Sequence, residues 1–418
     1  LRRAITEFIY MLRRDDLGNF QITLAAQSMN SFRHRFMGHP IFIDNNEKAL
    51  EIARDGYMGG RTEAFWIGKV KGAVHVVDIN SQYPAVMATT PMPTKLRGVW
   101  NHVSLQELAD TMVQNCVVAH VRLDTKSNHF PKRSGTRLVF PVGRFWTTLC
   151  TPELETAMQL NAISAVRHVA VYERAVIFRD FVEFFYAKRL EAKAAGDAAH
   201  SYMYKILMNS LYGKFGQAGR VFTDVGKAPN IRFGTWSEYD HETGETTRYR
   251  QVADLVQRMA TEGESLNSSP AISAHVASAG RALLSRYIDQ AKPENVFYCD
   301  TDSLMVNDAG LAFLVGVLDT DTLGMLKHER TVYDTEIRNL KHYYADGHWT
   351  IKGIRKKAVE LEDNVFQQDT FRGFKGMFAA GDVERMLITN TVKHLRPEYH
   401  KGTVQTTGRV EPFLLHED

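Results

Sequence analysis

Two aspartates separated by a single residue, Asp300 and Asp302, lie at the centre of residues 296–306, and both flanks of this stretch are apolar and β-prone. The pattern predicts a strand–turn–strand hairpin. Residues two apart in an extended chain project from the same face, so the two carboxylates would lie close together. That placement is costly unless a cation neutralises it, and Mg²⁺ prefers carboxylate oxygen. Alone, an Asp-x-Asp sequence is more often a solvated turn, so a metal site also needs a third carboxylate and a source of phosphates.

Asp78 is the candidate for the third carboxylate. A largely β-branched run, residues 74–77, ends in this acid, and the turn that follows closes with Tyr83 and Pro84. The run predicts a central strand with the carboxylate at its end. Acids at strand ends are usually turn formers, so Asp78 becomes a candidate metal ligand only in the company of the hairpin at 296–306.

Basic side chains that suit phosphates occur on two consecutive predicted helices. Residues 178–193 form the first helix, residues 194–197 break it, and a second helix follows until Gly213 ends it. Helices joined by a short break pack antiparallel, so their basic faces can converge. Three cations and an amide on one face would suit a triphosphate, although a solvated helical hairpin would show the same charges. These side chains are Arg189, Lys193, Lys205 and Asn209, with Tyr212 further along the second helix.

Two more stretches are candidates for phosphate or nucleic-acid contact. Residues 57–61 contain paired glycines, which let a backbone approach another molecule closely, beside an arginine able to hold a phosphate. A surface turn explains them equally well. Residues 338–357 interleave basic and aromatic side chains, as a nucleic-acid surface does, although a solvated edge strand remains an alternative. The first stretch reads Tyr57-Met58-Gly59-Gly60-Arg61; the second contains Arg338, Lys341, Tyr343, Tyr344, Trp349, Lys352, Arg355, Lys356 and Lys357.

The composition places these residues in a chain of ordinary globular type. It has 418 residues, 44% of them hydrophobic and 24% charged, which is enough for two or three sub-domains. The net charge is only +3, so any basic surface must be local. No apolar run approaches the ~18 residues of a membrane span, and we expect no membrane association. Three cysteines without metal-like spacing indicate an intracellular, reducing compartment.

The remaining segments predict the surroundings of these motifs. Residues 1–36 have helical spacing of apolar residues, and the chain starts at Leu1, so we expect an upstream portion to be missing. Residues 94–150 are loop-rich. Residues 216–268 are polar, with a hairpin tip at 240–246, which indicates an insert or arm. The last residues, 372–418, indicate a small helical lobe.

Together, the strand-end acid, the helical cations and the acid pair resemble the polymerase motifs of family B DNA polymerases. The three motifs read Asp78-Ile79-Asn80-Ser81-Gln82-Tyr83-Pro84, Lys205-Ile206-Leu207-Met208-Asn209-Ser210-Leu211-Tyr212-Gly213 and Tyr298-Cys299-Asp300-Thr301-Asp302-Ser303. Further stretches resemble the protein-primed branch found in phages, adenoviruses and linear plasmids. Residues 57–61 resemble its Tyr-x-Gly-Gly motif, Lys341-His342-Tyr343 its Lys-x-Tyr motif, and Lys352-Gly353 a nearby lysine-glycine element.

The resemblance implies an α+β fold, the right-hand polymerase with an antiparallel-sheet palm, helical-hairpin fingers, a small thumb and two insertions. The implied domains are 1–72, an N-terminal helical connector; 73–93, the first part of the palm; 94–150, an insertion resembling terminal-protein region 1; 151–177, the palm continuation; 178–215, the fingers; 216–268, a second, DNA-enclosing insertion; 269–360, the palm with the catalytic hairpin and the Lys-x-Tyr motif; and 361–418, the thumb.

The resemblance also implies roles for the site residues. Asp78 and Asp302, with the Ile79 carbonyl, would bind two Mg²⁺ ions, for which Mn²⁺ can substitute, and Asp300 ranks below them as an electrostatic group. Tyr83 would exclude the ribose 2′-hydroxyl. The residues implied to bind dNTP are Tyr83, Arg189, Lys193, Lys205, Asn209 and Tyr212. Those implied to contact primer-template DNA are Tyr57, Gly59, Gly60, Arg61, Gly213, Lys341, Tyr343 and Lys352.

The implied activity is template-directed DNA synthesis by a monomer, with a terminal protein as the implied primer. Two alternatives stay open: a related polymerase that starts from ordinary primers or without any primer, and a catalytically dead nucleic-acid-binding relic. The chain departs from the family in three ways. Gln82 stands where the family usually has leucine, the stretch 216–268 is long, and the exonuclease domain expected upstream is absent from this chain.

Overall fold

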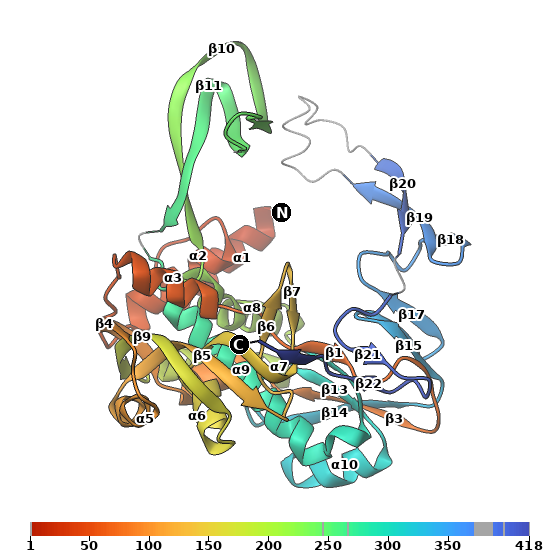
Figure 1. Cartoon of the computed structure of the whole chain (residues 1–418). Helices are drawn as coiled ribbons and strands as arrows, with labels where there is room; N and C mark the ends of the chain where they lie inside the picture. The colour runs from red at the N-terminus through yellow and green to blue at the C-terminus, as the bar shows by residue number, and fades with distance from the viewer. Residues whose placement is uncertain (1, 245, 266, 372–387, 396–397, 418) are drawn as a thin grey trace. The chain divides into compact units, whose positions relative to one another are not determined.

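The computed structural model describes residues 2–417, except for residues 245, 266, 372–387 and 396–397. The chain divides into two compact units (Figure 1). The first unit consists of residues 1–216, 269–350 and 399–418, and the second of residues 217–268 and 351–398.

A five-stranded antiparallel sheet in the order β1–β12–β13–β3–β14 forms the centre of the first unit. Strand β3 is buried along nearly all its length, because Val77 and Ile79 pack into one apolar cluster while Val74 and Val76 pack into another. This burial on both faces explains its apolar sequence. The strands are β1 (Thr62–Ala64), β12 (Val296–Asp300), β13 (Ser303–Val306), β3 (Val74–Ile79) and β14 (Leu326–Val332).

Helices pack with this sheet around the largest apolar cluster of the described residues, and four of them position the candidate site. Helix α9 is almost wholly buried and rich in Ala, Ser and Gly, so its neighbours approach closely. A Cβ atom on its Gly280 would lie only 3.0 Å from the Tyr83 ring of α4. The helices are α4 (Gln82–Thr89), α7 (Arg179–Ala194), α8 (Ala198–Phe215) and α9 (Pro270–Ala291), and the shorter α10 (Asp308–Leu314), η2 (Pro293–Asn295) and η3 (Val315–Val317) flank the hairpin in sequence.

A second five-stranded sheet, in the order β23–β8–β5–β9–β4, has its own apolar cluster with α5 and α6. The boundary predicted at residue 150 divides this sheet, because strand β9, within the segment 151–177 that was predicted to continue the palm, pairs with both β4 and β5. The elements are β4 (Met92–Asn101), α5 (Leu105–Gln114), β5 (Cys116–Thr125), β6 (Lys132–Ser134), β7 (Arg137–Val139), β8 (Val142–Cys150), α6 (Thr151–Gln159), β9 (Ile163–Ala175) and β23 (Leu414–His416).

The N-terminal segment is helical, but not throughout. Its helices are α1 (Arg2–Arg14), α2 (Leu24–Ser31), the π-helix η1 (Phe32–Phe36) and α3 (Glu47–Gly56). The predicted connector 1–72 then ends in strands, since β1 joins the central sheet and β2 joins a four-stranded sheet in the order β17–β16–β15–β2. Those strands are β2 (Gly68–Val70), β15 (Thr335–Asn339), β16 (His342–Ala345) and β17 (His348–Ile351). None of the described helices is long and apolar enough to cross a membrane.

The second unit contains a long antiparallel hairpin, β10 (Ala218–Tyr239) and β11 (Thr246–Glu264), and a three-stranded sheet of β18 (Val359–Glu362), β19 (Val365–Phe371) and β20 (Ile388–His394).

The helical lobe predicted for 372–418 is wrong for its described residues, which form strands β20, β21 (Thr403–Val404), β22 (Val410–Glu411) and β23. Residues 372–387 of that prediction lie outside the described residues. The β-branched runs at 388–394 and 403–404 favour strands over helices.

Candidate active site

The turn between β12 and β13 brings Asp302 next to Asp78. Thr301 adopts a left-handed conformation, with φ of 63°, and its amide donates to the Arg61 carbonyl at 2.7 Å. The Asp302 carbonyl accepts a 2.6 Å hydrogen bond from the Ile79 amide, and Ser303 stands opposite Asp78 in the sheet. These backbone contacts fix two carboxylates from segments more than 200 residues apart in one place.

The nearby positive side chains do not fully neutralise these two carboxylates, so both carboxyl groups have raised pKa values. Burial, followed by the charge of Asp302, raises the pKa of Asp78 to about 7, while Lys205 and Lys327 act in the opposite direction. Burial also raises the pKa of Asp302, and Lys205 again opposes the rise. A bound cation would relieve this cost.

The donor set fits a hard divalent cation that also uses ligands from a substrate. Among the described residues, no group of three or more His, Cys, Asp or Glu side chains is arranged to hold a metal ion. Asp78 and Asp302 therefore supply only part of a coordination shell. Mg²⁺ is commonly held in this way, by one or two carboxylates together with substrate phosphates and water.

Asp300 has a different environment from the other two acids. Its carboxylate accepts from Lys341 Nζ at 2.7 and 2.8 Å and from Thr62 Oγ1 at 3.1 Å. Lys341 itself has a left-handed backbone, with φ of 52°, and its amide donates to the Tyr298 hydroxyl at 2.8 Å. The lysine predicted to contact DNA is thus the counter-ion of Asp300 in this structure.

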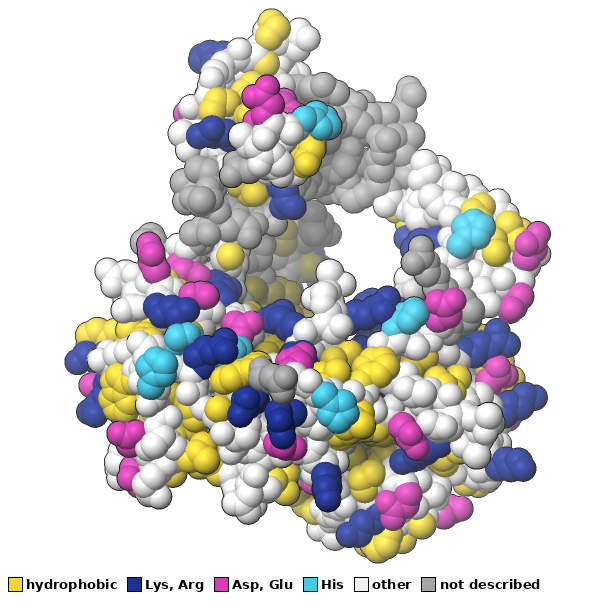
Figure 2. All heavy atoms as spheres, in the orientation of Figure 1, with side chains coloured by type: hydrophobic (Ala, Val, Ile, Leu, Met, Phe, Trp, Pro, Cys, Tyr) yellow, Lys and Arg dark blue, Asp and Glu magenta, His cyan; other side chains and the backbone are white. Residues whose placement is uncertain are grey.

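The predicted cations of α7 and α8 do come together. Arg189, Lys193 and Lys205 line a hollow of about 340 Å³ between the two helices. Arg189 donates to Ser81 Oγ at 2.9 Å, and the exposed Lys193 lies 3.5 Å from Asp321. Figure 2 shows Lys and Arg interspersed with Asp and Glu over the face drawn there, in keeping with the low net charge of +3.

Asn209 does not line this hollow. Its side-chain amide donates to the Lys205 carbonyl of its own helix at 2.8 Å. The structure therefore gives the predicted contact between Asn209 and a triphosphate no support in this conformation.

The rings of Tyr83 and Tyr212 lie against each other near the carboxylates, tilted by 36° with their centroids 4.6 Å apart. Tyr83 is confined by glycines on two sides. A Cβ atom on Gly60 would lie 3.0 Å from its hydroxyl and 2.8 Å from Thr301 Cγ2, and one on Gly280 would touch its ring. Gly60 is therefore required by close packing at this site, and a rigid ring is held where a nucleotide sugar is predicted.

The prediction that Arg61 holds a phosphate or DNA is wrong for this structure. Its side chain is fully buried, where Nε donates to Glu63 at 2.6 Å and Nη1 to Ser285 at 3.1 Å, and it packs over the Phe140 ring. A buried charge needs such a partner. Arg61 instead supports the hairpin, because its carbonyl accepts from Thr301.

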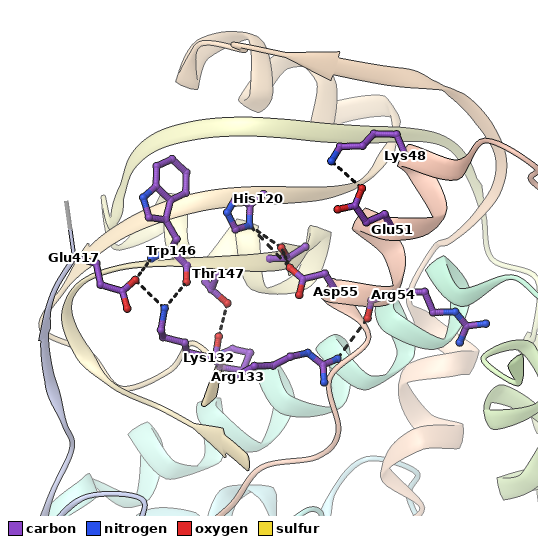
Figure 3. Close-up of polar contacts among 12 residues, drawn as sticks. Lys48, Glu51, Arg54, Asp55, His120, Lys132, Arg133, Trp146, Thr147 and Glu417 are labelled. Atoms are coloured by element: carbon purple, nitrogen blue, oxygen red, sulfur yellow. Dashed lines mark hydrogen bonds and ion pairs between the residues drawn. The ribbon is translucent and has the colours of Figure 1, made fainter. Parts of the chain in front are cut away.

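The other residues of the glycine motif also have structural contacts. The Tyr57 ring packs where a Cβ of Gly216 would stand, and the Tyr57 carbonyl accepts from Arg133 at 2.6 Å. Figure 3 shows Arg133 reaching toward the end of α3 in this region. Gly59 and Gly213 have open space in place of a side chain, so packing does not require glycine at either position.

The remaining predicted DNA contacts separate. The Tyr343 ring lies 5.6 Å from that of Tyr298, beside the Asp300–Lys341 pair. Lys352 is an exposed residue of the second unit. Its predicted contact with DNA stays a prediction.

Sequence reasoning missed a buried ion pair beneath the glycine motif. Arg281 of α9 is bidentate to Glu153, at 2.7 and 2.8 Å, and donates to the carbonyls of Met58 and Gly59 at 2.6 and 2.9 Å. The available signal was Arg281 itself, an arginine in the middle of a helix segment, residues 270–285, that is otherwise made largely of small and apolar residues. Lys327, opposite Asp78 in β14, was also missed.

Comparisons with known proteins agree with this geometry. The chain is 27% identical over 316 residues to a DNA-directed DNA polymerase of Enterobacteria phage PRD1, covering 73% of this chain and 52% of the relative. It is 25% identical over 347 residues to a probable DNA polymerase of Ascobolus immersus, covering 79% of this chain and 27% of that relative. The chain thus spans about half the length, or less, of these two relatives.

A solved structure confirms the predicted α+β polymerase fold. Phi29 DNA polymerase, complexed with primer-template DNA and incoming nucleotide substrates, matches 92% of this chain and 69% of its own with a TM-score of 0.64 and 16% identity. The family model for DNA polymerase type B, organellar and viral, matches residues 5–260. Because this match spans more than half of the sequence, the chain belongs to the organellar and viral type B DNA polymerases.

Proposed function

We propose that this chain is the polymerase part of a template-directed DNA polymerase, which adds dNTPs to a 3′ hydroxyl. The observation that carries the proposal is the pair of partly buried carboxylates, Asp78 and Asp302, held side by side by backbone hydrogen bonds near Lys205. Nucleotidyl transfer consists largely of positioning and of neutralising charge on phosphate oxygens. Carboxylates that bind metal ions and basic side chains that bind phosphates would supply both the positioning and the neutralisation.

The carboxylates would hold two Mg²⁺ ions, with Mn²⁺ as a substitute and the Ile79 carbonyl as an additional ligand. When bound, such ions activate the attacking 3′ oxygen and neutralise the leaving pyrophosphate. The chain's own residues bind and orient the substrate: Arg189, Lys193 and Lys205 bind the triphosphate in the hollow between α7 and α8. The Tyr83 ring excludes a ribose 2′-hydroxyl, and Tyr212, whose ring lies against that of Tyr83, flanks the nascent base pair.

The partners we propose are primer-template DNA and dNTPs, which the solved phi29 complex contains. Lys341 and Tyr343 remain proposed DNA contacts, as does Lys352 in the second unit. We retain the proposed palm, fingers and DNA-enclosing arm, and extend the first insertion to residue 175, where β9 ends. The three cysteines are buried and free, which supports work in a reducing compartment.

Protein priming is the start mode that we propose, for replication of a linear mobile-element, plasmid or viral genome. The relatives are a phage enzyme and a probable DNA polymerase of Ascobolus immersus, and the glycine and Lys-x-Tyr stretches resemble the protein-primed branch. Starting without a protein is the second candidate, since terminal-protein contacts have no short sequence motif.

One experiment tests both levels of the proposal. A primer-free reaction with labelled dNTP is run with and without a candidate terminal protein, beside a primed template. Label in extended primer supports the polymerase, and label on the added protein supports protein priming. Label in free DNA without that protein would contradict protein priming, and an inert chain on the primed template would contradict the proposed activity.

A further inference from the structure

A buried polar bridge joins the N-terminal helices to α8, the helix that carries Lys205. Asp15, directly after α1, is 7% exposed, and Tyr204 of α8 is 2% exposed. The Tyr204 hydroxyl donates to Asp15 Oδ2 and accepts from Arg14 Nη2 at 2.8 Å, while Arg14 Nε donates to Asp15 Oδ1 at 3.0 Å. The single proton of the hydroxyl and a lone pair are therefore both used.

The charge of Asp15 is maintained within this bridge. Burial alone would raise the pKa of the Asp15 carboxyl, but hydrogen bonds from Arg14 and Tyr204 outweigh burial and lower the pKa. Hydrogen bonds to an ionised group are about twice as strong as neutral ones. The bridge is consequently a directional contact between α1 and α8.

A second polar contact holds α8 three residues further on. Ser28 of α2 is fully buried, and its hydroxyl donates to the Leu207 carbonyl at 2.6 Å. The loop between α1 and α2 is fixed in turn, because Gln27 and Ser31 both donate to the Leu17 carbonyl, at 3.1 and 2.8 Å.

Aromatic packing surrounds these polar contacts. The Phe32 ring lies 5.1 Å from that of Phe178 and 6.1 Å from that of Phe215, and the Phe36 ring lies 5.3 Å from that of Phe184. Such contacts supply area but tolerate rotation of a helix about its own axis. The hydrogen bonds at Tyr204 and Leu207 do not, since they weaken steeply with angle.

Tyr204 and Leu207 bracket Lys205 in the helix, so holding them fixes the direction in which Lys205 points. We propose that Asp15 and Tyr204 are positioning residues, which set the rotation of α8 so that Lys205 faces the triphosphate hollow. The role rests on the proposed function, because it is Lys205 that binds nucleotide there. The N-terminal helices α1 and α2, which contribute no side chain to the triphosphate hollow, would thereby affect the affinity of the site for nucleotide.

The test compares two conservative variants, Tyr204→Phe and Asp15→Asn, with chemically matched controls on α1 and directly after it. Tyr10→Phe removes a hydroxyl from a side chain that is 59% exposed, and Asp16→Asn alters the 2.8 Å pair with His34 at the surface. We expect the KM for dNTP to rise about tenfold in both bridge variants, with kcat changed less than about twofold. The controls should match wild type.

A second readout does not require turnover. dNTP should protect Lys205 from acylation, followed by mass spectrometry, and the half-protecting concentration should rise in the bridge variants by the same factor as the KM. Ser28→Ala, which removes the contact to Leu207, replaces any bridge variant that fails to fold and should show the same split between KM and kcat.

The possible failures are distinguishable. Wild-type protein that extends no primer overturns the proposed function. The positioning role alone is overturned if wild-type protein extends primers but the folded bridge variants have the same KM and protection values as the controls. A loss of thermal stability without a change in KM would likewise make the bridge merely structural.

Discussion

The two halves of the proposed active site are built in opposite ways. The acidic half consists of Asp78 on strand β3 and Asp302 in the turn between β12 and β13; both are partly buried, and burial raises the pKa of both carboxyl groups. The basic half lies on helices, where Lys193 and Lys205 are exposed to solvent. Buried like charges are costly without a cation, whereas exposed lysines cost little and can move. The two carboxylates on the sheet are therefore held in place to bind a cation, whereas the lysines on the helices can move to contact a substrate.

The largest expected effect comes from removing the acidic half. Asp302→Ala and Asp78→Ala should each lower primer extension by at least about a thousandfold, since electrostatic stabilisation of the transferring phosphate is lost. Duplex affinity should stay within about threefold, because it comes mainly from phosphate contacts elsewhere. Single-turnover extension and a filter-binding assay measure the two quantities. Extension by Asp302→Ala at a rate near that of wild type would refute the metal assignment.

Much of this half was predictable because its signals are local. A strand ending in an acid and a hairpin centred on Asp-x-Asp follow from apolar patterning over ten residues. The structure adds the register of β3 and β13, which places Asp78 opposite Ser303. Asp300 also ranked below its neighbours in the prediction, and the structure provides a reason, the ion pair with Lys341.

The errors arise where distant partners decide the outcome. Arg61 looked available for phosphate, but Glu63, Ser285 and the Phe140 ring enclose it, and two of these lie far along the chain. Strand β9 was placed in the palm because nothing in residues 163–175 reveals that β4 and β5 are its neighbours. Short-range patterns identify elements, whereas pairing of remote segments is a tertiary choice.

The basic half should show a graded response. Lys205→Ala should raise the KM for dNTP by about ten- to a hundredfold, because a charge-assisted contact to the triphosphate is lost. Lys193→Ala should have a smaller effect, of about threefold, since this lysine is 65% exposed and already shared with Asp321. Steady-state kinetics on a primed template measures both. Equal effects of the two variants would contradict the ranking.

The Asp300–Lys341 ion pair allows a test of whether Lys341 acts on the acidic half of the site or on DNA. Lys341→Gln should lower kcat/KM about tenfold, because an unneutralised Asp300 adds negative charge beside Asp302. Asp300→Asn in the same chain should restore most of that loss. If Lys341 acts mainly on DNA, the double variant will stay impaired and its duplex affinity will fall with that of the single variant.

The smallest effect concerns stability and needs no substrate. The pKa of Asp78 is raised to about 7 from an ordinary value of 3.8, so between these values the folded protein binds more protons at this site than the unfolded chain. Stability must then fall as pH rises through that window, by linkage. Asp78→Asn removes the titration and the repulsion from Asp302. In chelator, the variant should therefore melt roughly 2–4 °C above wild type at pH 8 and close to it at pH 5.

Other groups titrate over the same range, so the difference between the two proteins, and not either melting curve alone, carries the result. Excess Mg²⁺ supplies the internal control: it should raise the melting temperature of wild type at pH 8, because the ion binds the folded state, and should raise that of Asp78→Asn less. A variant that is less stable than wild type at pH 8 without metal would show that the Asp78 carboxylate is already well satisfied. The contrast between a strained acidic half and a relaxed basic half would then fail at its central residue.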